Sequence, residues 1–302
     1  MTIANYTNDG HYPILIALCN ASAGRGHLPK EDLIQLCTVS DAPKHVRSTL
    51  ATWRSLGLFV DNENGEICLD ARFAKKRNES LEEFTTRIPA MCRQLLFDVR
   101  HALPLWPADG KISDDGIGES GDFVRILAWT LAQDIYTFSF DAPWAVAEAL
   151  ESAQVSPGKF IIKNDTRWPG MHFWARYTGF ASGESRCIDP TEAVRAELPE
   201  IFRGAKALSA GDFIRGLSAR LPVLDFGGYR VEVENVLNDS VWRRPPNGQL
   251  STSLSLALRR LQLDRTLVLD APADGGKTFT LSGRNFRPWG NFSTVELRKK
   301  SR

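Results

Sequence analysis

The chain has 302 residues, enough for two or three domains that each bury a core, and eight Trp with sixteen Phe supply large side chains for burial. Its 37 Lys and Arg nearly balance 36 Asp and Glu, which excludes a strong global attraction to nucleic acid or anionic membranes. Five cysteines without a C-x-x-C pair, a polar start and no apolar run of roughly 18 residues argue against a disulfide scaffold and a membrane span, and predict a cytoplasmic protein.

Basic surface must therefore be local, and three short segments concentrate basic side chains. They are Arg72, Lys75, Lys76 and Arg77; Arg243 and Arg244; and the tail Arg298, Lys299, Lys300 and Arg302. Solvated faces explain such clusters more often than binding does, so the clusters alone assign no function.

Residues 11–72 predict three short helices followed by a β-hairpin. The segment YPILIALCNASA gives a helix that ends in a glycine-rich turn, and Pro29 opens the next helix. Asp41 can cap a third helix that starts near Pro43, and LFVDNENGEICLD contains Asn-Gly, the strongest short-range hairpin signal. The apolar face of the third helix is formed by Val46, Leu50 and Trp53. This order is typical of a winged helix, which we assign to residues 1–72.

Residues 73–205 predict a mainly helical middle region. Helices are expected over LEEFTTRIPAMCRQLLFDVRHAL, DFVRILAWTLAQDIYTF and PWAVAEALESA, with Asp141 as the cap of the last one. The segment WPGMHFWARYTGFASGESRCIDP echoes WRSLGLFVDNENGEICLD, so a further winged-helix-like module at about 120–190 and a plain helical region are both open. The stretches at 108–122 and 242–248 are expected to be exposed connections.

Residues 206–302 predict a second winged helix with a basic tail. SAGDFIRGLSARL and LSTSLSLALRRLQL have helical patterns, and TLVLDAPADGGKTFTLSG is expected to form a hairpin. YRVEVENVLN fits a strand or a helix, and its surroundings favour a helix. The predicted fold class is therefore mainly α with small β-hairpins (α+β), in which tandem winged-helix modules are joined by a helical middle region.

The third predicted helix carries the candidate DNA contacts. They are Lys44, Arg47, Ser48 and Arg54, which lie opposite the apolar face. Side chains of these types can reach phosphates and base edges from a helix in the major groove. The hairpin that follows carries Asp61, Glu63 and Glu66, and these carboxylates would repel the phosphate backbone. We therefore expect contact from the helix and not from the hairpin.

The helix LSTSLSLALRRLQL suits a protein partner better than a DNA groove. Its outward face is expected to hold Thr252, an exposed Leu256 and Arg259, with Ser255 and Arg260 at the edges. An apolar centre with an arginine rim is typical of protein interfaces. DNA contact and protein docking both stay open, because a fold alone does not decide a function.

No catalytic residue, metal site or cofactor is predicted. The run from Ala271 to Thr278 nearly matches a phosphate-binding loop, but strand-like TFTLSG stands where that loop must open a helix, which favours a hairpin tip. The histidines lack cysteines or carboxylates at zinc-ligand spacing, and His172 among aromatic residues is expected to be packing.

Three segments carry a family resemblance. WPGMHFWARYTGF, CIDPTEAVRAELPEIF and the run from DFGGYRVEVENVLN to TLSGRNFRPWG resemble the DpdG-like proteins of bacterial gene clusters that put 7-deazaguanine bases into DNA. The matching motifs are structural, so the resemblance carries over no active-site residue. It implies membership of a defence assembly that restricts foreign DNA, in which other subunits supply nuclease or ATP-driven activity.

The sequence therefore predicts a non-enzymatic, multi-winged-helix subunit of a bacterial anti-phage defence or DNA-modification system. Its expected partners are double-stranded DNA, other subunits of that system, or both. One alternative is a docking adaptor without DNA contact, and another is a dimeric transcription regulator that reads two half-sites about one helical turn apart.

Overall fold

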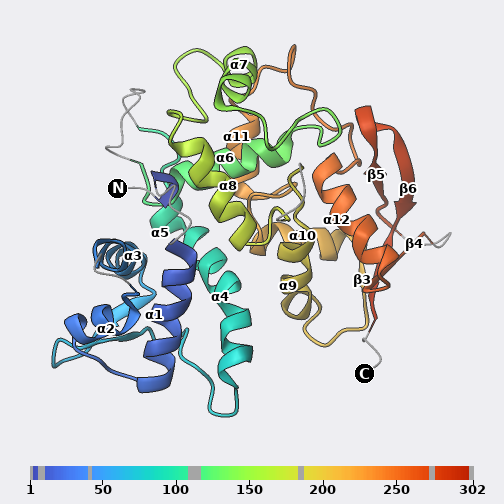
Figure 1. Cartoon of the computed structure of the whole chain (residues 1–302). Helices are drawn as coiled ribbons and strands as arrows, with labels where there is room; N and C mark the ends of the chain where they lie inside the picture. The colour runs from blue at the N-terminus through green and yellow to red at the C-terminus, as the bar shows by residue number, and fades with distance from the viewer. Residues whose placement is uncertain are drawn as a thin grey trace.

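The computed structural model describes residues 3–5, 11–39, 43–107, 117–182, 187–271 and 276–298. As predicted, the fold is mainly helical with small antiparallel strand pairs (Figure 1). The helices are η1 (Ile3–Asn5), α1 (His11–Arg25), α2 (Lys30–Cys37), α3 (Lys44–Ser55), α4 (Leu81–Leu96), α5 (Val99–Ala102), α6 (Gly121–Ala132), α7 (Trp144–Gln154), α8 (Arg167–Tyr177), α9 (Thr191–Phe202), α10 (Ala210–Arg220), α11 (Gly228–Glu234), α12 (Thr252–Leu263) and η2 (Arg284–Phe286). Within the described ranges, no helix is both long and apolar enough to cross a bilayer.

The N-terminal part follows the predicted order of three helices and a hairpin. β1 (Phe59–Asp61) pairs antiparallel with β2 (Ile67–Leu69), and Leu28, between α1 and α2, adds an antiparallel bridge to Ile67. The predicted apolar stripe of α3 is buried, which holds this helix against α1. The predicted cap Asp41 lies outside the described residues. The order is that of a winged helix, and the winged-helix assignment itself stays a prediction.

The centre of the molecule is α6, all of whose residues are buried. It packs against α8 and α11, and a helix that is apolar on every side is expected in such a position. Its one acidic residue, Asp122, accepts a hydrogen bond from Arg167 at 2.6 Å, and both side chains are buried. The expectation that 108–122 is an exposed connection is therefore wrong at its C-terminal end. Asp122 lies in the first turn of α6, and its carboxylate is buried with Arg167.

The start of α7 differs from its prediction. Asp141 does not cap the helix: Pro143 is the N-cap residue, with no side-chain bond, and the carboxylate of Asp141 pairs with Arg176 at 3.6 Å. At the other end of α7, the buried carboxylate of Glu151 accepts hydrogen bonds from the backbone N–H groups of Ile161 (2.5 Å) and Ile162 (3.1 Å). Burial raises the pKa of this carboxyl to about 7.

The C-terminal strands pair differently from the prediction. The strands are β3 (Ala207–Ser209), β4 (Leu267–Asp270), β5 (Phe279–Ser282), β6 (Pro288–Phe292) and β7 (Thr294–Leu297). The predicted hairpin of β4 with β5 is wrong: β4 pairs with β7, which also pairs with β3, and β5 pairs with β6. The reason is that the segment after residue 283 supplies two strands where only a tail was expected. A strand does follow the phosphate-loop-like run, as predicted, and residues 272–275 of that run lie outside the described residues.

Candidate nucleic-acid interface

The predicted DNA contacts of α3 lie together on the surface. Lys44, Arg47 and Arg54 are exposed, and Ser48 is half-buried with its hydroxyl donating to the carbonyl of His45 at 3.2 Å. We call these four residues the α3 face. It forms part of the surface of the N-terminal unit, where α3 is seen nearly end-on (Figure 1). Three of the four predicted side chains are therefore exposed and one is half-buried, and their role in DNA contact stays a prediction.

Both arginines of the α3 face are engaged with carboxylates. The guanidinium of Arg47 donates to both carboxylate oxygens of Glu31 on α2, at 2.7 and 2.5 Å, and Arg54 pairs with Asp61 on β1. The hydrogen bond from Arg47 lowers the pKa of Glu31, so the pair keeps its charges at neutral pH. Each pair cancels the net charge that a phosphate would meet, which leaves Lys44 as the cation of this face without an ion-pair partner among the described residues.

The predicted partner face of α12 is more buried than expected. Leu256 is half-buried and packs on the core, while Thr252 and Ser255, placed outward by the sequence pattern, are buried. The hydroxyl of Ser255 accepts a hydrogen bond from the backbone of Ser282 in β5, which ties α12 to the hairpin. The expectation of an exposed leucine is therefore wrong, because β5 and α9 cover this helix.

The two arginines of that predicted face are exposed but point to different partners. Arg260 donates to the carboxylate of Asp189 at 2.5 Å, and Arg259 donates to the side chain of Gln262 at 2.7 Å. Arg259 also borders a shallow groove whose apolar lining includes Leu281, Phe292 and Trp289. Of the predicted partner residues, only Arg259 therefore lies beside an apolar surface.

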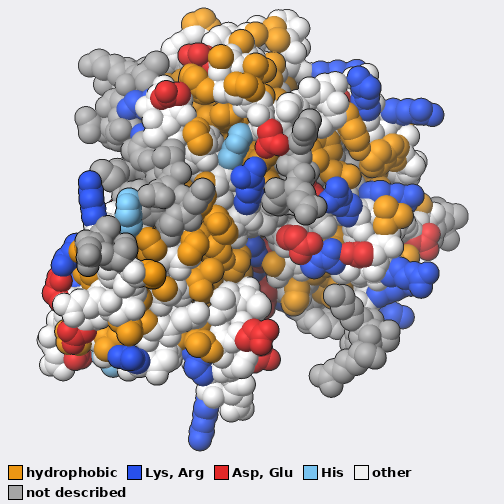
Figure 2. All heavy atoms as spheres, in the orientation of Figure 1, with side chains coloured by type: hydrophobic (Ala, Val, Ile, Leu, Met, Phe, Trp, Pro, Cys, Tyr) orange, Lys and Arg blue, Asp and Glu red, His pale blue; other side chains and the backbone are white. Residues whose placement is uncertain are grey.

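A second basic surface lies at the end of the β5–β6 hairpin, and the sequence did not single it out. Arg284 is the first residue of the short helix η2 between the two strands, and Arg287 follows its last residue. The guanidinium of Arg243 lies 5.4 Å from the ring centroid of Phe286. All three arginines are exposed, and in the described part of the chain none has a carboxylate at ion-pair distance. We call these three residues the arginine surface. Lys and Arg side chains gather at this end of the hairpin in Figure 2.

Exposed aromatic side chains adjoin the arginine surface. Trp289 on β6 is 46% exposed and Tyr136 is 37% exposed, and their rings meet edge to face with centroids 5.9 Å apart. Gly283 makes this possible, since a Cβ there would lie 2.4 Å from the indole nitrogen of Trp289. Asn285 and Phe286 both have positive φ, which turns the chain tightly between the strands. Arginine beside exposed aromatic rings is the combination found in surfaces that bind single-stranded nucleic acid.

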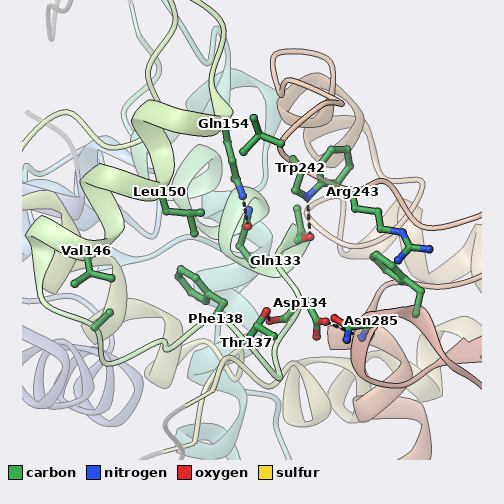
Figure 3. Close-up of a pocket in the computed structure, with 14 residues that line it drawn as sticks. Gln133, Asp134, Thr137, Phe138, Val146, Leu150, Gln154, Trp242, Arg243 and Asn285 are labelled. Atoms are coloured by element: carbon green, nitrogen blue, oxygen red, sulfur yellow. Dashed lines mark hydrogen bonds between the residues drawn. The ribbon is translucent and has the colours of Figure 1, made fainter.

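An open pocket of about 400 Å³ includes Arg243 of the arginine surface in its lining (Figure 3). Phe138 and two aliphatic residues of α7, Val146 and Leu150, form one side, and Trp242 lies on the other. Phe286, whose ring lies under the guanidinium of Arg243, also lines the pocket. The indole of Trp242 donates to the carbonyl of Ala132 at 3.1 Å, which fixes that wall against α6. The pocket thus joins the middle of the chain to its C-terminal hairpin.

The remaining basic clusters are engaged or lie elsewhere. Arg72 pairs with Asp70, and Arg244 pairs with Glu234 at 2.7 Å. Further exposed cations without ion-pair partners among the described residues lie near the end of the three-stranded sheet at which β3 and β4 begin and β7 ends. They are Arg203, Lys206, Arg265 and Arg298. Lys299, Lys300 and Arg302 of the predicted tail lie outside the described residues.

Buried titratable groups in the described ranges have structural roles. His172 packs between the rings of Phe140 and Trp168, at centroid distances of 4.1 and 4.3 Å, as its aromatic context predicted. Burial lowers its pKa to about 3, so it is neutral at physiological pH. Cys19, Cys37 and Cys92 are buried free thiols.

Comparison with known proteins gives one match. The family model described as DpdG-like matches residues 1–275, which is most of the chain and ends before β5. No match is found among curated proteins or solved structures.

Proposed function

The chain belongs to the DpdG-like family, and from this premise we propose that it is a non-catalytic, DNA-contacting subunit of the Dpd 7-deazaguanine modification system. Family membership suggests a role in that system and partnership with its other subunits. The contact with DNA and the lack of a catalytic role are our own proposals, and they rest on the surfaces described above.

One observation carries the DNA contact: the arginine surface presents three guanidinium groups with no carboxylate at ion-pair distance among the described residues, beside exposed aromatic rings. Guanidinium groups bind phosphates in a bidentate way, and each phosphate neutralised releases counterions. The α3 face is the weaker candidate, because binding there would require Arg47 and Arg54 to leave Glu31 and Asp61. Lys44, the cation of this face without an ion-pair partner among the described residues, could add one further phosphate contact.

The non-catalytic role is supported by how the perturbed groups are used. Glu151 has a raised pKa, but its carboxylate is occupied by two backbone N–H groups, and His172 is neutral and packed between aromatic rings. Perturbed pKa values mark functional sites only when the group is also placed to act on a ligand. Both residues instead hold elements of the fold together.

A docking adaptor is the second candidate, and the groove beside Arg259 favours it. Its apolar lining from β5 and β6, with an arginine at the rim, resembles the core and rim of a protein interface. Replacing Leu256 would test this poorly, since that side chain packs on the core. Arg259→Glu is the better variant: it should weaken binding to another purified Dpd subunit if the groove docks one, and leave DNA affinity unchanged.

The proposal is tested by fluorescence anisotropy of a labelled duplex over a salt series. Three phosphate contacts predict that log K falls with log salt at a slope of about −3, and replacing Arg243, Arg284 and Arg287 by Ala should remove most of that slope. The matched control replaces the three exposed arginines at the other end of the sheet, Arg203, Arg265 and Arg298, and should leave the slope unchanged. Absence of binding at low salt would overturn the DNA-contacting role. A salt slope reduced only in the control variant would show that DNA binds at Arg203, Arg265 and Arg298 and not at the arginine surface.

A further inference from the structure

The pocket that Arg243 lines has a mostly apolar interior. One side is the ring of Phe138 with the side chains of Val146 and Leu150, and Trp242 lies on the other side (Figure 3). Phe286 also lines the pocket, under the guanidinium of Arg243. Val146 is 57% exposed, so this side opens to solvent and needs no rearrangement for entry. A volume of about 400 Å³ exceeds that of any single amino-acid side chain or nucleobase, and facing apolar and aromatic side chains suit a planar ring.

The inner end of the pocket is polar and held in place by hydrogen bonds. The side-chain amide of Gln154 donates to the carbonyl oxygen of Gln133 and accepts from the indole N–H of Trp129, both at 2.9 Å. Gln133 in turn donates to the backbone carbonyl of Trp129 at 3.0 Å. Each amide nitrogen has a second N–H, so the two side chains are fixed and still have donors for a ligand.

The mouth of the pocket brings a carboxylate and a guanidinium to the same opening. Asp134 accepts a hydrogen bond from the backbone N–H of Asn285 at 2.9 Å, which ties the hairpin turn to the segment after α6. Arg243 stands across from it over the Phe286 ring (Figure 3). A carboxylate oxygen has more than one lone pair, so Asp134 can still accept from a ligand N–H. Donors and acceptors at one opening match the mixed edge of a heterocyclic base.

We infer that this pocket receives one unstacked nucleobase of the DNA strand whose phosphates lie on the arginine surface. The inference rests on the proposed DNA contact and adds what that contact reads. The phosphates flanking an extruded base lie close to it. Arg243 lines the pocket, and Arg284 and Arg287 are the chain neighbours of two further lining residues, Asn285 and Phe286. Phe138 and Phe286 stack against the ring, and the amides of Gln133 and Gln154 with the Asp134 carboxylate contact its polar edge. A protein side chain is the less suitable occupant, because Arg243 lines the pocket and has no carboxylate at ion-pair distance among the described residues, as is also true of Arg284 and Arg287 beside the lining.

The test compares three labelled duplexes: fully paired, with one bulged 2-aminopurine, and with an abasic site at the bulge. Wild-type protein should bind the 2-aminopurine duplex about tenfold more tightly than the other two, and stacking should quench its fluorescence. Val146→Trp changes an exposed position of α7 to fill the pocket, and Phe286→Ala removes a wall. Both variants should lose the tenfold preference and the quenching, and Val146→Trp, which leaves Arg243 and the ring beneath it in place, should retain affinity for the paired duplex.

The outcomes separate this inference from the proposed function. Equal affinity for all three duplexes, or a preference unaffected by both pocket variants, would overturn the base pocket and leave the DNA-contacting role standing. Failure to bind any duplex at low salt would overturn the DNA-contacting role. Circular dichroism of Val146→Trp and Phe286→Ala should show wild-type folding, and two variants at opposite walls ensure that misfolding of one does not decide the result.

Discussion

The α3 face and the arginine surface carry similar numbers of basic side chains but differ in what lies beside them. On the α3 face, Arg47 and Arg54 are paired with carboxylates of α2 and β1, whereas Arg284 and Arg287 have no acidic partner among the described residues. Exposed ion pairs stabilise a fold little, but they do cancel the charge that a polyanion would meet. The comparison teaches that uncompensated charge, and not the count of cations, is the quantity to seek in a nearly neutral protein.

Reversing charge at the arginine surface gives the largest expected effect. Arg284→Glu with Arg287→Glu removes two cations and adds two anions, a change of about four charges facing the phosphates. With a slope of about 0.9 per phosphate, the loss of two phosphate contacts should lower affinity for duplex DNA about 60-fold at 0.1 M salt, and repulsion by the two added carboxylates should lower it further. Electrophoretic mobility shift would measure this.

The control for that variant makes the same charge change elsewhere. Arg265→Glu with Arg298→Glu alters two exposed arginines. Arg265 follows the C-terminal end of α12, and Arg298 follows the last residue of β7. If DNA contact depends on position, this variant should lose less than about tenfold. Equal losses in both variants would mean that only net charge matters, and the comparison would then fail.

The second prediction concerns stability and separates the pocket region from the N-terminal part. The pKa of Glu151 is raised from 4.5 to about 7 by burial, so the folded protein holds this proton more tightly than the unfolded chain. The corresponding stability is full below pH about 4.5 and is lost as pH rises through about 7. Glu151→Gln does not titrate, so the unfolding free energy of wild type should fall relative to the variant by up to about 3 kcal/mol between pH 5 and pH 8.

Urea unfolding at several pH values, followed by tryptophan fluorescence, would measure this difference. Hydrogen exchange should place the effect at Ile161 and Ile162, whose backbone N–H groups donate to the Glu151 carboxylate. The surface pair of Glu31 and Arg47 serves as the contrast: the pKa of Glu31 is lowered, so Glu31→Gln should add no pH dependence in this range. A constant difference between wild type and Glu151→Gln would contradict the raised pKa.

Local patterns predicted much of the helical structure. Prolines, the Asn-Gly turn and the Val46-Leu50-Trp53 stripe depend on neighbours within a few turns, so α1, α2, α3 and the β1–β2 hairpin followed from them. The ambiguous segment around Val233 is helical, as its surroundings favoured. The pairing of β4 with β7 could not be read in this way, because strand partners far apart in sequence are chosen by tertiary packing.

The candidate site shows the same limit. The sequence placed Lys44, Arg47 and Arg54 on one exposed face but could not show that acidic residues from α2 and β1 neutralise two of them. The arginine surface combines residue 243 with residues after 283, which only the folded hairpin brings together. One local signal was available, the alternation of arginine with aromatic residues in GRNFRPWG, and it is typical of nucleic-acid-binding segments.

The third prediction converts the α3 face into an uncompensated one. Glu31→Gln with Asp61→Asn removes the two carboxylates that hold Arg47 and Arg54 and leaves both arginines exposed. If paired charge is what prevents binding there, duplex affinity should rise about three- to tenfold and the salt slope should steepen by about one to two. Anisotropy titrations of wild type and variant at four salt concentrations would show it, and an unchanged slope would mean that the shape of this face excludes DNA.

The smallest effect is expected where the sequence placed the DNA contact. Arg47→Ala with Arg54→Ala removes two cations but also frees Glu31 and Asp61, so the net charge of the face falls by two while no phosphate contact is lost. Affinity should change by less than about threefold and the salt slope by less than one, measured in the same titrations. A slope that flattens by two would show that the ion pairs open on binding, and the α3 face would then be a DNA contact that forms by exchanging carboxylates for phosphates.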